Sequence, residues 1–151
     1  MVRGYRQWAG VGASIVLGLI FIASSLGKLP HQVEFLAIIL PKSFLTPLLA
    51  QLVASWLPWI ELVLGSLLIL GIAAKIMASF SAVLIVTFIY YNSWMISHGL
   101  GHESCGCFGE VPLSNMGALY FDVGMLALVV IILFCYPRHF FTIRPWFFRT
   151  K

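Results

Sequence analysis

The sequence contains little charge and few acidic residues. Charged residues make up 9% of the chain, and five of its 151 residues are Asp or Glu, whereas about a quarter of the residues in a soluble globular domain are charged. Hydrophobic residues make up 61% of the chain, and the mean hydropathy is +1.01. This balance excludes a soluble globular protein and indicates an integral membrane protein in contact with the lipid bilayer.

The chain also lacks the length for a soluble module beside its membrane segments. At about 20 residues per span, its 151 residues allow roughly four spans with little left over. The net charge of +4 does not indicate nucleic-acid binding, because the basic residues stand at the ends of apolar runs and form no stripe with interleaved aromatic residues. We therefore predict a single membrane domain over residues 1–151 and no nucleic-acid partner.

Four apolar runs predict four transmembrane helices, and hence an all-α integral membrane protein folded as a four-helix bundle. The predicted spans cover residues 8–27, 56–74, 76–97 and 115–136. The second helix can start as early as Pro47 and continue through Pro58, because proline is tolerated within membrane helices.

Between the first two spans, prolines divide residues 30–47 into pieces too short to cross a membrane. Apolar side chains in this segment share one face of a helix that would begin at Pro30. They are Val33, Leu36, Ala37 and Leu40. This spacing predicts a short interfacial helix that caps one end of the bundle.

Lys and Arg are distributed unequally between the two sides of such a bundle. Lys28 and Lys42 lie on one side, and the others lie on the side of the termini. These others are Arg3, Arg6, Lys75, Arg138, Arg144, Arg149 and Lys151. The positive-inside rule therefore places both termini, with a basic and aromatic tail over residues 137–151, in the cytoplasm. The loop over residues 98–114 has no Lys or Arg and is expected to face outward.

Cysteine is scarce, yet two of the three cysteines lie one glycine apart in this outward loop. Cys105 and Cys107 would there face an oxidising compartment, where thiol pairs tend to form disulfides. A disulfide between cysteines with one residue between them requires a restricted set of backbone conformations, which Gly106 makes accessible. The strain in such a small ring would make the disulfide easy to reduce. We predict a redox-active pair, with a static staple or two unpaired thiols as the alternative.

Two histidines stand in the same loop. His98 and His102 are candidate bases that would promote formation of a cysteine thiolate. Together with the cysteine pair they are also weak candidates for zinc or copper ligands, although their spacing fits no strong template. Cys135 is separated from Cys107 by a whole helix, roughly 30 Å, and is expected to be a buried apolar residue.

Two carboxylates fall inside predicted spans. Glu61 and Asp122 would each lie about 5–10 Å below the outer surface, and Lys28, at the outer end of the first span, is within reach of them. Carboxylates at membrane depth usually pair and face the bundle interior, so we predict a buried polar cluster of these three residues. The polar residues expected beside it are Tyr90, Tyr91 and Asn92. The cluster would relay protons during thiol oxidation, or act as a structural ion pair that fixes helix register.

Several short motifs resemble the MauE branch of the DoxX-like membrane proteins. They are Arg6 before the first span, Ser25-Leu-Gly-Lys-Leu29 at its end, Pro58-Trp-Ile-Glu-Leu-Val-Leu-Gly65 in the second span, and Cys105-Gly-Cys-Phe-Gly109 before the fourth. Their order and spacing match along most of the chain, and the last motif is the specific one.

This resemblance implies a four-helix bundle in a bacterial cytoplasmic (inner) membrane. It also implies help in the maturation of periplasmic, disulfide-containing redox proteins, such as a methylamine dehydrogenase subunit, alongside a thioredoxin-like partner. More distant DoxX-like relatives are linked to thiosulfate:quinone oxidoreduction, which makes a quinone the cofactor to consider, although the sequence shows no motif that binds one.

Taken together, the residues and the resemblance predict a thiol–disulfide redox or maturation factor that presents its Cys-Gly-Cys loop to a periplasmic redox partner. Two alternatives stay open. One is a non-catalytic subunit of a larger membrane redox or energy-transducing complex. The other is a quinone-linked, DoxX-like oxidoreductase subunit.

Overall fold

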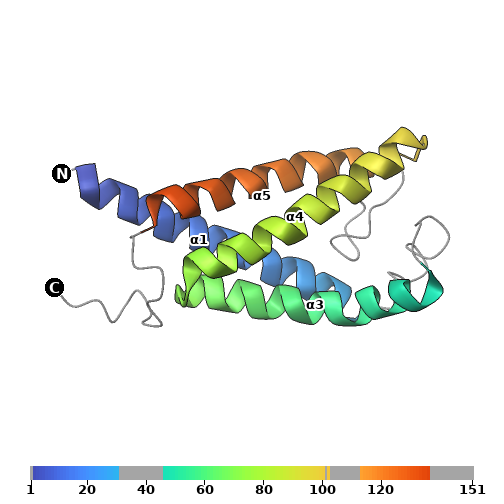
Figure 1. Cartoon of the computed structure of the whole chain (residues 1–151), viewed down its shortest axis with the longest axis horizontal. Helices are drawn as coiled ribbons and strands as arrows, with labels where there is room; N and C mark the ends of the chain where they lie inside the picture. The colour runs from blue at the N-terminus through green and yellow to red at the C-terminus, as the bar shows by residue number, and fades with distance from the viewer. Residues whose placement is uncertain (1, 31–45, 101, 103–112, 137–151) are drawn as a thin grey trace.

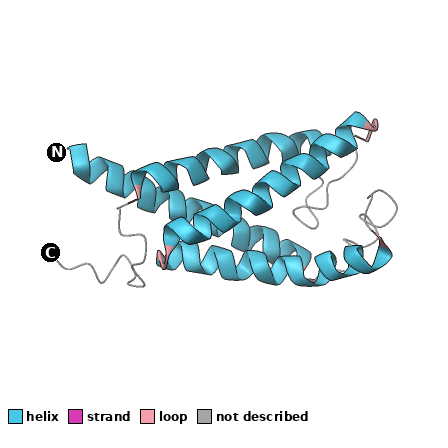
Figure 2. Cartoon of the chain, viewed as in Figure 1, coloured by secondary structure: helices cyan, strands magenta, loops and turns pink. Residues whose placement is uncertain are grey.

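The computed structural model of the chain describes residues 2–30, 46–100, 102 and 113–136, and these residues form four long helices and no strand (Figure 2). The helices are α1 (Val2–Lys28), α3 (Pro47–Leu70), α4 (Ala74–Ser97) and α5 (Asn115–Cys135) (Figure 1). Each is long and apolar enough to cross a membrane. The prediction of an all-α membrane protein with four spanning helices is confirmed.

Three predicted features fall outside the described residues: nearly all of the interfacial segment, the cysteine pair and the basic tail. The interfacial helix, the disulfide and the position of the tail therefore stay predictions.

Helix α3 has the earlier of the two starts considered for the second span, but it ends before the predicted residue. It begins at Pro47, where the fixed backbone angle of proline suits the first helical position, and it continues through Pro58. It ends at Leu70 rather than at residue 74, because Gly71 takes a left-handed conformation (φ 69°) and its N–H turns back to the carbonyls of Leu67 and Leu68. Lys75, which falls between the predicted second and third spans, lies in the first turn of α4.

Two glycines determine how closely α1 packs against α3. A Cβ atom added at Gly18 would lie 2.7 Å from the carbonyl oxygen of Gly65, and one added at Gly65 would lie 2.7 Å from that of Gly18. Such close backbone approach is how membrane helices gain packing energy in the absence of a hydrophobic driving force between them. Among the described helices, the α1–α3 contact is the most extensive, followed by α4–α5 and α1–α5, and the contact between α3 and α4 is the smallest of these four.

The largest hydrophobic core cluster lies mainly between α1, α4 and α5. Its most deeply buried members are Leu17, Phe21, Leu68, Ala78, Ile85, Val129 and Ile132. A smaller cluster joins the first half of α3 to α4 and consists of Ala50, Ala54 and Leu57 with the partly buried Val53, Leu84 and Phe88. Large apolar side chains on the outer faces, such as Trp56 and Phe134, are exposed, as expected for surfaces that meet lipid.

The helices alternate in direction, so the connections gather at two ends (Figure 1). One end holds the start of α1, the α3–α4 turn and the end of α5. The other holds the end of α1, the start of α3 and the connection between α4 and α5. We call the second the loop end, because the cysteine loop of the sequence joins the helices there.

Candidate functional site

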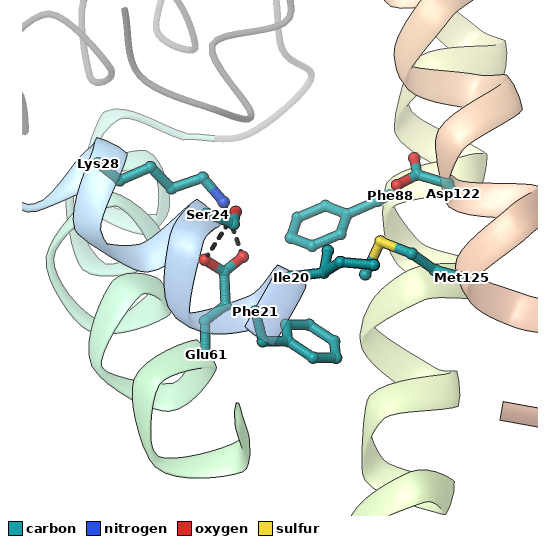
Figure 3. A pocket seen from close by; sticks show the side chains of 8 residues that line it. All are labelled: Ile20, Phe21, Ser24, Lys28, Glu61, Phe88, Asp122 and Met125. Carbon is teal, nitrogen blue, oxygen red and sulfur yellow. Dashed lines mark hydrogen bonds and ion pairs between the residues drawn. The ribbon is translucent and has the colours of Figure 1, made fainter. Parts of the chain in front are cut away.

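A buried ion pair joins α1 to α3 toward the loop end. Lys28 Nζ lies 2.7 Å from Glu61 Oε1, and both side chains are 1% exposed. Ser24 Oγ donates a second hydrogen bond to Glu61 Oε2 at 3.2 Å (Figure 3). Charge-assisted hydrogen bonds of this kind are about twice as strong as neutral ones. The carboxylate is thus held at both oxygens by groups from a single neighbouring helix.

The same face of α1 makes further polar contacts with α3. Ser25 Oγ donates to the carbonyl of Pro58 at 2.7 Å, and Ser14 Oγ donates to the carbonyl of Leu68 at 2.7 Å. These buried serines were not predicted as site residues. The spacing along α1 could have predicted Ser24, because it lies one helical turn before Lys28 and therefore on the same face of the helix.

Asp122 is held from the other side of the bundle. Its Oδ2 atom accepts a hydrogen bond of 2.9 Å from Asn92 Nδ2, which links α5 to α4. Asn92 is one of the polar residues expected beside the cluster, and it bonds directly to a carboxylate. Tyr90 is 62% exposed, and Tyr91 places its hydroxyl in a buried position with no hydrogen-bond partner among the described residues.

A small cavity separates the ion pair from Asp122. Its volume is about 20 Å³, and its lining residues are Ile20, Phe21, Ser24, Lys28, Glu61, Phe88, Asp122 and Met125 (Figure 3). The Phe88 ring lies 5.2 Å from Lys28 Nζ, a distance suited to a cation–π interaction. The structure therefore brings all three predicted members of the polar cluster to one cavity, with Lys28 paired to Glu61 and Asp122 lining the same space. A space of this size holds about one water molecule and is far too small for a quinone ring.

The two candidate bases are both exposed. His98 follows α4, where its ring packs on Trp94 with 4.1 Å between centroids and its Nδ1 atom lies 2.9 Å from the Trp94 carbonyl oxygen. His102 is exposed on a turn. Within the described ranges no three His, Cys, Asp or Glu side chains are grouped to hold a metal. The role of the histidines as bases or ligands beside the cysteine pair stays a prediction, because the pair lies outside those ranges.

Asn115 holds the two ends of the cysteine loop together. Its side chain is 1% exposed, and its Nδ2 atom donates to the carbonyl of Leu100 at 2.6 Å. The neighbouring Ser114 caps α5, because its Oγ accepts a hydrogen bond from the Gly117 N–H at 3.2 Å. The bond from Asn115 was not predicted. No local sequence pattern predicts that the side-chain amide of the first residue of a helix bonds to a backbone carbonyl fifteen residues earlier.

Cys135 ends α5 at the end of the helix farthest from the cysteine loop. A helix of 21 residues is about 30 Å long, so Cys135 is remote from the loop within one chain. It is a free thiol and half-buried, whereas a buried apolar residue was expected.

The sequence match to a known family covers every residue of this site. Residues 6–135 match the family described as methylamine utilisation protein MauE. The chain belongs to the MauE family. This MauE-family protein is thus a multi-pass membrane protein, and its family points to methylamine utilisation. No curated protein and no solved structure matches the chain.

Proposed function

We propose that this MauE-family protein is a membrane factor that exchanges thiols and disulfides with a periplasmic redox protein through Cys105 and Cys107. The observation that carries the proposal is the position of the Cys-Gly-Cys motif. It falls within the residues matched to the family and between α4 and α5, whose ends Asn115 ties together. The partner class is a disulfide-containing redox protein of the periplasm, with a thioredoxin-like protein as one candidate.

The proposed reaction exchanges two electrons between the Cys105–Cys107 pair and a pair of cysteines in the partner protein. A thiolate of the reduced pair attacks one sulfur of the partner's disulfide and releases the other partner sulfur as a thiolate, which gives a mixed disulfide. The second cysteine of the pair then attacks this bond, so the pair becomes a disulfide and the partner a dithiol. Two electrons pass to the partner in this direction, and the reverse sequence oxidises the partner instead. The strain of a ring closed over Gly106 would make the disulfide of the pair easy to reduce, so it favours the direction in which the pair oxidises its partner.

Single serine variants test this proposal by trapping the intermediate. In Cys105→Ser or Cys107→Ser, the remaining cysteine can still form the mixed disulfide with the partner. The second cysteine that would attack this bond and release the partner is missing. We expect one of these variants to accumulate a covalent adduct in native membranes. The adduct should be visible without reducing agent, and mass spectrometry of the gel band would identify the partner. Cys135→Ser is the matched control and should behave as the wild type, because Cys135 lies at the other end of α5.

The double variant Cys105→Ser/Cys107→Ser separates this function from that of a structural subunit. Loss of partner maturation in a protein that still reaches the membrane and assembles is the expected result. Normal maturation with normal assembly would overturn the thiol-exchange proposal and favour a non-catalytic subunit of a larger membrane complex. The small cavity beside Lys28 offers no support for a quinone at that position.

A further inference from the structure

The three ionisable side chains around the buried cavity do not balance in charge. The cavity is lined by Lys28 of α1, Glu61 of α3 and Asp122 of α5, whereas α4 contributes the uncharged Phe88. Lys28 and Glu61 are each 1% exposed and Asp122 is 7% exposed. With all three ionised, the group would carry one net negative charge inside a membrane domain, where an uncompensated charge is very costly.

We propose that this cavity is a binding site for one exchangeable proton, carried by Asp122, with one water molecule in the space between Asp122 and the ion pair. The volume of about 20 Å³ matches one water molecule. The polar lining groups Lys28, Glu61, Asp122 and Ser24 supply the partners that such a water needs. The proposal stands without the cysteine pair, because it depends only on these residues.

Hydrogen bonding decides which carboxyl group holds the proton. Glu61 receives the Lys28 ammonium group at 2.7 Å and the Ser24 hydroxyl at 3.2 Å, and both stabilise a negative charge on it. Asp122 receives the uncharged Asn92 amide at 2.9 Å on Oδ2, which leaves Oδ1 to carry the proton. Glu61 is therefore the fixed counter-ion of Lys28, and Asp122 is the group that gains and loses a proton.

A metal cation is a poorer occupant of the same space. Sodium or potassium would also neutralise the excess charge, and oxygens of Glu61, Asp122 and Ser24 are suitable ligands. The ammonium group of Lys28 lines the same small cavity, however, and would repel a second cation at such short range. A proton on Asp122 removes the net charge without that repulsion.

Infrared spectroscopy of the purified full-length protein in lipid vesicles tests this inference directly. A protonated carboxyl group has a carbonyl stretch distinct from the bands of carboxylates, and it shifts when water is exchanged for heavy water. At neutral pH we expect the wild type to show one such group that is missing in Asp122→Asn. A wild-type spectrum that equals that of Asp122→Asn would overturn the proposal.

The net charge of the three side chains predicts two further results. Neither is expected if Asp122 is protonated independently of Lys28 and Glu61. In Glu61→Gln, Asp122 becomes the counter-ion of Lys28, so the protonated-carboxyl band should disappear. In Lys28→Met, no cation is left and both carboxyl groups should be protonated, so the band should double in area. Retention of the wild-type band in Glu61→Gln would show that the three groups do not act as one site.

Two controls keep these outcomes interpretable. Lys75→Met removes a lysine at the opposite end of the bundle and should leave the band unchanged. Circular dichroism identifies variants that have lost their helices, and the comparison of wild type with the nearly isosteric Asp122→Asn decides the proposal even if Lys28→Met fails to fold.

Loss of the wild-type band when sodium or potassium replaces an organic cation in the buffer would reveal metal binding and contradict a proton site.

Discussion

Lys28 and Glu61 stabilise the bundle only as a pair, because either side chain alone would leave a buried charge without its counter-ion. The pair is nearly inaccessible and its closest atoms are 2.7 Å apart. Desolvation makes a buried ion pair a weak net stabiliser compared with apolar residues, yet the loss of one partner from such a pair is expensive. The arrangement is therefore better suited to fixing the register of α1 against α3 than to adding stability.

A double-mutant cycle tests this coupling. We expect Lys28→Met alone to lower the free energy of unfolding by about 3 kcal/mol, toward the low end of the range for broken buried pairs, because the stranded carboxyl group can neutralise itself. The double variant Lys28→Met/Glu61→Gln should lose less than the sum of the two single variants. Denaturant titration in mixed micelles measures these differences. Strictly additive losses would show that the two residues act independently.

The sequence predicts which residues enter the polar cluster, but it does not predict how they pair. Depth along a helix follows from residue count, so Lys28, Glu61 and Asp122 could be placed near one level. Helix arithmetic gives similar depths for both carboxylates and cannot decide which one meets the lysine. The choice depends on the Gly18–Gly65 contact, which sets α1 beside α3 and brings Glu61, one turn before Gly65, to the turn that carries Ser24 and Lys28.

At the scale of helices, glycine determines both the tightest packing and the least predictable boundary. The apolar run continues across residues 71–73, so composition alone does not mark the turn between α3 and α4. The end of α3 depends on the left-handed conformation of Gly71, whose carbonyl oxygen also lies 3.5 Å from the hydroxyl of Tyr136, the residue after α5. Such a boundary is set by tertiary structure, which explains why the predicted span extended too far.

Alanine substitution of two glycines in α1 tests the packing. Gly18→Ala should destabilise the protein by about 1–3 kcal/mol, because the new methyl group meets the backbone of Gly65 and the helices must separate. The matched control is Gly12→Ala, where an added Cβ has no neighbour within 4 Å. That change should be neutral or slightly stabilising, since alanine favours helix more than glycine does. Equal effects at the two positions in the same unfolding assay would contradict a close α1–α3 contact.

For the whole molecule, composition was sufficient to predict the fold class, because a chain with so few charges must place its helices in lipid. Orientation rests on a different property, the asymmetry of Lys and Arg between the two ends of the bundle. We expect both termini in the cytoplasm and the cysteine loop in the periplasm.

Reporter fusions test this orientation. A fluorescent protein that folds only in the cytoplasm should be bright when fused after Lys151, and a phosphatase active only in the periplasm should be active when inserted between α4 and α5. The reverse pattern would place the cysteine pair in a reducing compartment, where a stable disulfide is not expected.

The redox state of Cys105 and Cys107 in intact cells shows whether these two cysteines form a reversible disulfide. The Cys135→Ser background leaves this pair as the only thiols in the chain. Cells are quenched with acid and their free thiols are labelled with a heavy maleimide before and after mild reduction. Before reduction, we expect molecules that carry no label. After reduction, these molecules should acquire two labels at a reductant concentration too low to open an unstrained structural disulfide. Two labels before any reduction, or no labels even after strong reduction, would contradict a reversible disulfide between these two cysteines.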